Sequence, residues 1–322
     1  MKVLVIKAPA TLAELPDEEY RAIVDASGGA EVVVCNDLAE AEPHLADAEV
    51  ILGSLTEAAF PKATSLKWMH AVSSGADALL YPAMVQSDVM LTGEKGLVGE
   101  HLADHAFALL LGLARQLPRA IMAAPEPYPL RLSLRADMVE MHDLTCGIVG
   151  LGGTGKAVAV RAKAFGMEVI AVDSEPVEPT DAAPVVWGMD RFEDLLRASD
   201  VVMVCCPLTP QTSHLFDDAA FEAMKDTALI VNVTRGAIID NEALARALAA
   251  GKIRGAGLDV TSPEPLPLDH ALWQQKNVII TPHTAGASQT RVHRNVARFV
   301  ANLRKYREGA ALEGEIDKVK GF

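Results

Sequence analysis

Three side chains capable of binding and acid–base chemistry, Arg235, Glu264 and His283, each follow a short apolar run in the C-terminal half of the chain. These runs are typical of buried strands: ALIVNV (228–233), GAGLDV (255–260) and NVIIT (277–281). Because the carboxyl ends of parallel strands meet at one edge of a sheet, we expect the three side chains there together. A guanidinium binds carboxylates, an imidazole transfers protons near neutral pH, and a carboxylate can hold that imidazole in one tautomer. The set suits reduction of a 2-keto acid.

Each of these residues also has an ordinary explanation when taken alone. A histidine after Pro282 is often a turn residue, and Glu264 lies in a proline-rich loop as any surface acid does. Arg235, directly before a glycine, could pair with an acid on the surface. The functional interpretation therefore depends on the combination on successive strand ends of one domain.

A glycine-rich segment upstream predicts a dinucleotide site. Its pattern is G-x-G-x-x-G, it directly follows the strand-like run CGIVG, and it opens a helical run, KAVAVRAKAFG. In such loops the first glycine allows a tight turn, the second lets a pyrophosphate approach the backbone, and the third allows close helix–strand packing. Two alternatives share the pattern: a glycine turn in an α/β domain that binds no nucleotide, and the cofactor loop of a methyltransferase. The residues concerned are Gly150, Gly152, Gly153, Thr154 and Gly155.

Asp173, at the end of the next strand-like run, favours NAD over NADP. Its carboxylate can accept hydrogen bonds from ribose hydroxyls and would repel a 2′-phosphate. The following residues, Ser174 and Glu175, supply no arginine for such a phosphate.

Short β-branched runs alternate with helical patterns along most of the chain, which is typical of βαβ units and parallel sheets. The predicted fold class is α/β, with two doubly wound parallel-sheet domains: a Rossmann-type NAD domain and a flavodoxin-like substrate domain. The pattern changes at Gly96, where a long, strongly apolar helix begins that suits packing between domains or subunits. Segment 124–143, with three prolines and no clear period, is expected to be an irregular arm.

Composition excludes some partner classes. The 322 residues carry 29 basic and 43 acidic side chains, a formal charge of −14, so nucleic acid and anionic membranes are not expected partners. No apolar run is long enough to span a membrane, and the first residues fit a strand better than a signal peptide. Four cysteines without a C-x-x-C pair fit reduced thiols in a cytoplasmic protein.

Two histidines, His101 and His105, stand four residues apart beside Asp104. Metals can use this spacing, but the segment is not H-E-x-x-H and the helix is strongly apolar. We interpret both as helix-face histidines and expect no metal.

At these motifs the chain resembles the D-isomer-specific 2-hydroxyacid dehydrogenases, over nearly its whole length. The resembling segments are HAVSSGADALLYP (70–82), CCPLTPQT (205–212), VNVTRGAIID, LDVTSPEPLP and TPHTAG. The resemblance implies that Arg235 binds substrate, His283 is the acid/base and Glu264 its partner. It implies substrate contacts near Ser74 and Gly75 as well as at Arg235 and His283. Further cofactor contacts are implied at Cys206, Pro207, Thr212, Val233, Thr234, Asp259 and Ala285.

The resemblance also implies a discontinuous substrate domain, residues 1–97 plus 288–322, around a dinucleotide-binding domain of residues 98–287. A homodimer would form through helix 98–118 and arm 119–143. The chain departs from the family where Leu102-Ala103-Asp104-His105 replaces the usual V-A-E-H, and a tryptophan is missing from the arm.

The expected function is therefore that of an NAD-dependent D-2-hydroxyacid dehydrogenase, working as a keto acid reductase of glyoxylate or hydroxypyruvate type. One alternative is a non-catalytic NAD(H)-sensing interaction protein with the same fold. Formate oxidation is disfavoured, because Glu264 gives His283 a partner suited to proton transfer.

Overall fold

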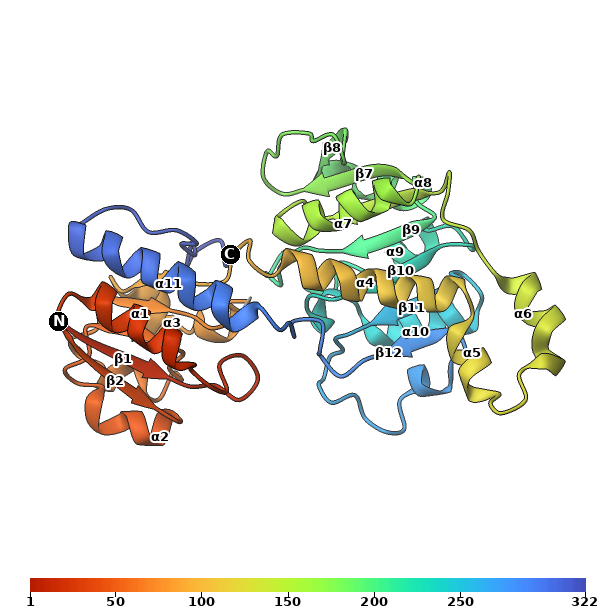
Figure 1. The fold of residues 1–322 in the computed structure, drawn as a ribbon. Helices are drawn as coiled ribbons and strands as arrows, with labels where there is room; N and C mark the ends of the chain where they lie inside the picture. Colours follow the sequence, from red (N-terminus) through yellow and green to blue (C-terminus); the bar gives the residue numbers. More distant parts are fainter. Residues whose placement is uncertain (74) are drawn as a thin grey trace. The chain divides into compact units, whose positions relative to one another are not determined.

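The structure, a computed structural model, describes residues 1–73 and 75–322 (Figure 1). They form two compact α/β units. The first joins Met1–Val98 to Ala287–Phe322, and the second is Gly99–Gly286.

The first unit is built on a five-stranded parallel sheet in the order β2-β1-β3-β4-β5. This is the flavodoxin-like order, in which the chain reverses direction across the sheet between β1 and β3. The strands are β1 (Lys2–Ile6), β2 (Glu31–Cys35), β3 (Val50–Leu52), β4 (Trp68–His70) and β5 (Met90–Thr92).

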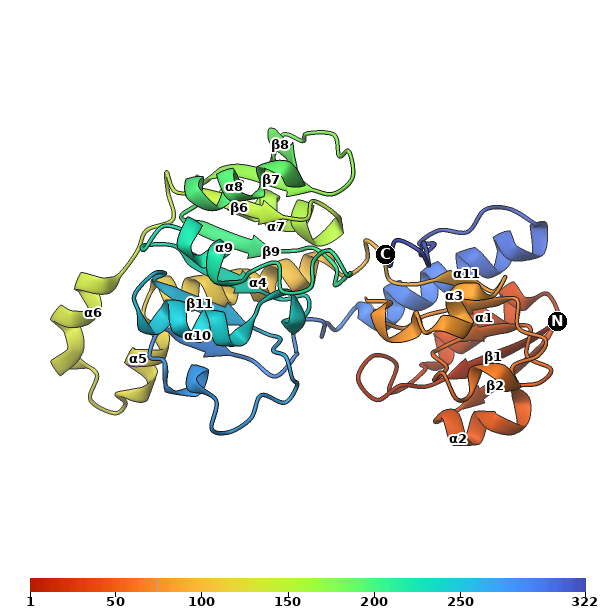
Figure 2. The same ribbon diagram turned by 180° about the vertical axis from the view of Figure 1, so that it is seen from behind.

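Successive strand residues point to opposite faces of this sheet, and both faces are buried in hydrophobic clusters. Val3 and Trp68 pack in one cluster with Ile23 and Phe299, and Leu4 and Met69 pack in the other. The helices that cover the sheet are α1 (Asp17–Ser27), α2 (Leu38–Ala41), α3 (Pro82–Gln86) and α11 (Arg291–Glu308) (Figure 2).

The second unit holds a seven-stranded parallel sheet in the order β12-β11-β10-β9-β6-β7-β8. The direction of chain progress reverses between β6 and β9, as in Rossmann folds, so a ligand site is expected at the carboxyl ends there. The strands are β6 (Thr145–Val149), β7 (Glu168–Asp173), β8 (Val185–Gly188), β9 (Val201–Val204), β10 (Leu229–Asn232), β11 (Gly255–Leu258) and β12 (Val278–Ile280).

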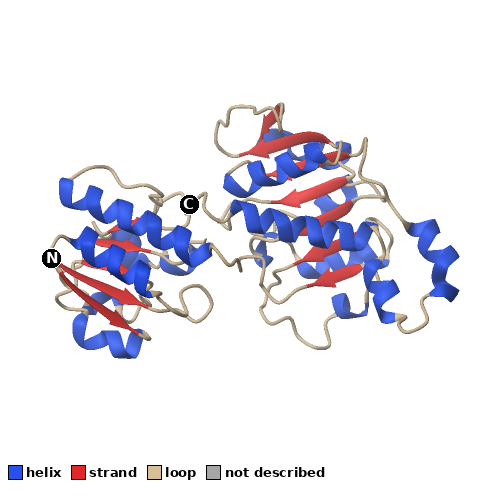
Figure 3. Cartoon of the chain, in the orientation of Figure 1, coloured by secondary structure: helices blue, strands red, loops and turns tan. Residues whose placement is uncertain are grey.

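Helices cover both faces of the second sheet (Figure 3). The strongly apolar α4 packs on α7 and on the sheet, which explains why most of its circumference is buried within its own unit. The predicted fold class, two doubly wound parallel-sheet domains, is confirmed. The helices are α4 (Gly99–Ala114), α5 (Leu117–Met122), α6 (Arg131–Asp137), α7 (Gly153–Ala164), α8 (Phe192–Ala198), α9 (Asp218–Ala223) and α10 (Asn241–Ala249).

The segment after α4 differs from expectation. The predicted long helix stops at Ala114, because Gln116 is left-handed with φ 58° and Pro118 follows. The arm, expected to be irregular, contains the short helices α5 and α6. They lack a clear period because few of their side chains are buried.

Candidate functional site

The glycine-rich segment forms a turn between β6 and α7. Gly150 has φ +93°, and a Cβ there would lie 2.7 Å from the Cα of Cys206. A Cβ on Gly155 would lie 2.1 Å from the carbonyl oxygen of Gly150. Both positions therefore require glycine for close backbone packing.

Gly152 and the start of α7 fit a pyrophosphate. A Cβ on Gly152 would meet nothing within 4 Å, so the space beside this backbone is open. The twelve-residue helix α7 begins at Gly153 and Thr154, and no side chain caps its first turn. Its N–H groups and positive dipole end are thus available to an anion.

Asp173 lies beside this turn at the end of β7. Its Oδ2 accepts from the backbone N–H of Leu151 at 2.6 Å, and Oδ1 accepts from that of Glu175 at 3.0 Å. The carboxylate is therefore fixed next to the loop, where ribose hydroxyls of a bound dinucleotide are expected.

The loop after β9 brings the backbone of Cys206 beside Gly150, and Pro207 follows it in the chain. Thr212 Oγ1 donates to the carbonyl oxygen of Pro207 at 2.7 Å and accepts from the N–H of Thr209 at 2.8 Å, which closes the loop on itself. Burial raises the pKa of the Cys206 thiol to about 12, so this wall carries a neutral thiol.

Arg235 follows β10 in a turn braced by the buried Asn232. The Asn232 side chain donates to the carbonyl oxygen of Arg235 at 2.9 Å and accepts from the N–H of Thr234 at 3.0 Å. A Cβ on Gly236 would lie 1.9 Å from the carbonyl oxygen of Thr261. The turns after β10 and β11 therefore pack together, which brings the segments of Arg235 and Glu264 side by side.

Glu264 and His283 form a hydrogen-bonded pair, with Oε2 2.9 Å from Nδ1. The other oxygen of Glu264 accepts from the N–H of Thr261 at 3.1 Å. The two side chains are 39% and 48% exposed, so the imidazole is open to solvent on its other side. This pair has the orientation required of a proton-transferring histidine and its partner.

The loop that carries His283 is held by Asp259, which is 1% exposed. Oδ1 accepts from Thr281 Oγ1 at 2.6 Å and from the N–H of Thr284 at 2.9 Å, and Oδ2 accepts from the N–H of Ala285 at 2.8 Å. His283 itself has φ 53° and donates its N–H to the carbonyl oxygen of Asp259 at 2.8 Å. The unusual backbone of His283 is thus fixed by its neighbours.

The family model for the NAD binding domain of the D-isomer specific 2-hydroxyacid dehydrogenases matches residues 107–285. This range includes the glycine turn, Asp173 and the three strand-end residues Arg235, Glu264 and His283. The chain belongs to this family. The resemblance seen in the sequence is confirmed, and an NAD-binding domain is present.

Curated relatives extend the similarity beyond that domain. The chain is 34% identical over 270 residues to a glyoxylate reductase of Korarchaeum cryptofilum, covering 82% of this chain and 81% of that one. It is also 34% identical to the human glyoxylate reductase/hydroxypyruvate reductase over 243 residues, 74% of this chain and 73% of the relative. A solved D-isomer specific 2-hydroxyacid dehydrogenase family protein from Aeromonas salmonicida aligns with TM-score 0.81 and 28% identity, covering 98% and 99% of the chains.

Of the two predicted substrate-loop residues, the structure describes Gly75, which lies in the first unit. Gly75 accepts a hydrogen bond at its carbonyl oxygen from Ser73 Oγ at 3.0 Å. Ser74 lies outside the described residues. The contacts expected of this loop with a substrate stay predictions.

His105 of the second unit, like Asn232, was given no part in the site by the sequence. His105, interpreted as a helix-face residue, has its Nε2 2.8 Å from Thr281 Oγ1 and 3.3 Å from Asp259 Oδ1. A signal was present, since His105 belongs to the segment that resembles the family's V-A-E-H. The neighbouring Asp104, where that segment departs from the family, accepts two hydrogen bonds from Arg161 of α7.

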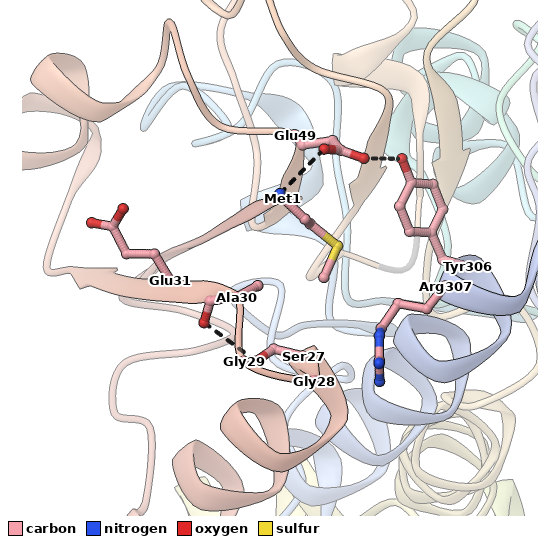
Figure 4. A pocket seen from close by; sticks show the side chains of 9 residues that line it. All are labelled: Met1, Ser27, Gly28, Gly29, Ala30, Glu31, Glu49, Tyr306 and Arg307. Carbon is pink, nitrogen blue, oxygen red and sulfur yellow. Dashed lines mark hydrogen bonds and ion pairs between the residues drawn. The ribbon is translucent and has the colours of Figure 1, made fainter.

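An open depression of about 700 Å³ in the first unit is lined by none of these residues (Figure 4). It is at the edge where β1 and β2 begin, the opposite edge from that used by ligands of parallel sheets. Its polar groups bind one another: Tyr306 donates to Glu49 at 2.8 Å, and the amino group of Met1 is 3.8 Å from the same carboxylate. We assign no function to it.

Two kinds of site have no support in the described part of the chain. Among residues 1–73 and 75–322, no three His, Cys, Asp or Glu side chains converge to hold a metal ion. In the same residues no helix combines the length and apolar character required to cross a membrane.

Proposed function

We propose that this chain is an NAD-dependent oxidoreductase that reduces a small 2-keto acid to the D-2-hydroxy acid. The observation that carries the proposal is the 2.9 Å contact between His283 and Glu264 at the sheet edge that also presents Arg235 and the glycine turn. A bound nicotinamide supplies the hydride for C2 of the keto acid.

Arg235 binds the substrate in this proposal. Its guanidinium can donate paired N–H groups to the carboxylate and carbonyl oxygens of a 2-keto acid. The hydrogen bond from Asn232 holds the turn, so the backbone that carries the Arg235 side chain is fixed. This fixed position orients C2 of the keto acid for reduction.

His283 supplies the proton. Glu264 accepts from Nδ1–H, which leaves Nε2 to carry the proton that passes to the former carbonyl oxygen as C2 is reduced. In the reverse direction the neutral imidazole takes the hydroxyl proton.

The preference for NAD over NADP rests on Asp173. The carboxylate is held beside the turn by two backbone N–H groups and would repel a 2′-phosphate at the adenosine ribose. Cofactor contacts at Cys206, Pro207, Thr212, Val233, Thr234 and Ala285 belong to the same proposal. Asp259 is included too, although its carboxylate already binds the His283 loop.

We propose a substrate of the glyoxylate or hydroxypyruvate type. Two relatives at 34% identity are named glyoxylate reductase and glyoxylate reductase/hydroxypyruvate reductase. In this proposal residues 98–287 are the dinucleotide domain, and residues 1–97 with 288–322 are the substrate domain, which contacts the substrate carboxylate near Gly75.

We also propose a homodimer formed through helix 98–118 and arm 119–143. The arm exposes large apolar side chains, among them Ile121 at 71%, Met122 at 86% and Leu132 at 80%. Such side chains in water favour association. Sedimentation velocity should show a dimer for the wild type and a monomer for Ile121→Asp/Leu132→Asp, whereas a monomeric wild type would refute the dimer.

The test of the function is an NADH-oxidation screen over a panel of 2-keto acids, with chiral analysis of the product and a repeat with NADPH. We expect turnover with glyoxylate or hydroxypyruvate, a D product where the product is chiral, and a lower kcat/KM with NADPH. NADH binding without oxidation on any keto acid would instead favour the sensing protein.

A further inference from the structure

His105 links the helix layer of the second unit to the loop that carries His283. It lies on α4, and its Nε2 is 2.8 Å from Thr281 Oγ1, at the end of β12. The same nitrogen is 3.3 Å from Oδ1 of the buried Asp259, after β11. One imidazole thus meets both strand ends next to the acid/base.

The hydrogen-bond partners fix the direction of this link. Both oxygens of Asp259 accept backbone N–H groups, which suits the carboxylate form. The carboxylate therefore accepts the single hydroxyl hydrogen of Thr281 at 2.6 Å. Thr281 then has only lone pairs to offer, so Nε2 of His105 is the donor. The chain runs from His105 to Thr281 to Asp259.

The helix that carries His105 is packed directly on the two strands concerned. A Cβ on Gly257 of β11 would lie 2.8 Å from Cβ of Leu109, and a Cβ on Gly112 would lie 3.0 Å from Ile279 of β12. His105, Leu109 and Gly112 are spaced i, i+4 and i+7, so they share one helix face. His105 is thereby held by a rigid platform.

This link acts on a strained segment. His283 has φ 53°, a conformation that non-glycine residues adopt only when their surroundings impose it. The imposing contacts are the hydrogen bonds from residues 283–285 to Asp259. By donating a hydrogen bond that orients Thr281 and Asp259, His105 therefore sets the position of His283 from the side of α4.

We propose that His105 is a positioning residue, which through Thr281 and Asp259 holds the loop of His283 in its reactive geometry. The proposal rests on the function proposed above. It requires no contact between His105 and substrate or cofactor. Small misplacements of a reacting group lower the rate more than they lower binding. We therefore expect the loss of His105 to lower kcat.

The test compares two pairs of variants in the full chain. His105→Leu and Thr281→Val remove the donor and the hydroxyl, whereas His105→Gln and Thr281→Ser keep them. We expect the first pair to lower kcat about 10-fold with the KM values and NADH affinity within about 2-fold, and the second pair to stay near wild type. The double variant His105→Leu/Thr281→Val should lose no more than the worse single variant, because both act through one chain.

A second readout is independent of turnover. Amide hydrogen exchange at Thr284 and Ala285 should be about 10-fold faster in His105→Leu and unchanged in His105→Gln. Unchanged exchange in His105→Leu, or equal losses of kcat in His105→Gln and His105→Leu, would overturn the proposal and leave a packing role. Failure of the wild type to oxidise NADH with any keto acid would overturn the proposed function instead, whatever the exchange result.

Discussion

The orientation of the Glu264 carboxylate toward His283 is set by the hydrogen bonds that Glu264 makes. The carboxylate is held by the N–H of Thr261 on one side and meets the imidazole on the other, so its orientation is fixed before any substrate arrives. Such a partner selects the tautomer of the histidine and stabilises its protonated form during proton transfer.

Glu264→Gln removes this charge while nearly keeping the shape. A hydrogen bond to a charged group contributes about 1.5–3 kcal/mol, so we expect kcat to fall about 10- to 100-fold. The KM for the keto acid should change little. Steady-state kinetics would check this, with Asp269→Asn, an exposed acid of the same loop, as control. Equal effects of both substitutions would point to the loop charge in general and contradict the pairing.

The sequence alone predicts Arg235, Glu264 and His283, because each follows an apolar run and parallel strands share one carboxyl edge. It does not identify His105 as their neighbour. That contact spans 176 residues of chain and depends on how α4 packs across the sheet. Asn232 is missed for the same reason, since its bonds to the Arg235 turn exist only once that turn has formed.

The turn between β6 and α7 separates two roles of glycine. Gly155 is needed for packing, since a Cβ would lie 2.1 Å from a backbone oxygen, whereas a Cβ on Gly152 would enter open space. The same residue type is thus structural at one position and available for a ligand at the other.

Gly152→Ala and Gly155→Ala form a matched pair for testing this difference. We expect Gly152→Ala to keep the melting temperature within about 2 °C and to weaken NADH binding at least about 10-fold, because a methyl group fills the space meant for the pyrophosphate. Gly155→Ala should destabilise the fold by roughly 1–3 kcal/mol. Calorimetry measures the stability of the two variants, and fluorescence titration measures their NADH binding. Tight NADH binding by Gly152→Ala would place the pyrophosphate elsewhere.

Among the elements, buried strands are the easiest to predict and edge elements the hardest. β1, β6 and β10 appear in the sequence as β-branched runs because both faces of the sheets are covered. Strand β8 was not predicted, since two of its four residues are exposed, the other two are only partly buried, and it lies at the sheet edge. Helices α5 and α6 were missed because exposed arms lack an apolar face to give them a period.

A buried histidine of the first unit makes the stability of the protein sensitive to acid. His70 is fully buried on β4, and its Nδ1 is 2.6 Å from Thr92 Oγ1. The same hydroxyl oxygen accepts a hydrogen bond from Trp68 Nε1 at 2.8 Å. Burial, with a smaller effect of the Arg298 charge, lowers the pKa of His70 to about 3 from its ordinary value of 6.5. The folded protein therefore keeps this imidazole neutral.

Stability should fall with acid through this group. Between about pH 6.5 and 3 the unfolded chain binds a proton that the folded chain does not, so the free energy of unfolding decreases as the pH drops through this window. At pH 5 the loss from His70 alone is about 2 kcal/mol relative to neutral pH. Urea unfolding at pH 7.5 and 5 measures it, with His70→Asn expected to show a correspondingly smaller decrease. Identical decreases in both proteins would contradict the buried neutral histidine.

The central claim is that His283 moves the proton during reduction of a 2-keto acid. The most direct measurement is the rate of NADH oxidation by His283→Ala beside the wild type, at saturating keto acid and with NADH binding measured separately. General acid catalysis contributes about 10²- to 10⁴-fold, so the variant should bind NADH normally and turn over at least about 100 times more slowly. A variant that oxidises NADH nearly as fast as the wild type would show that the proton comes from another group.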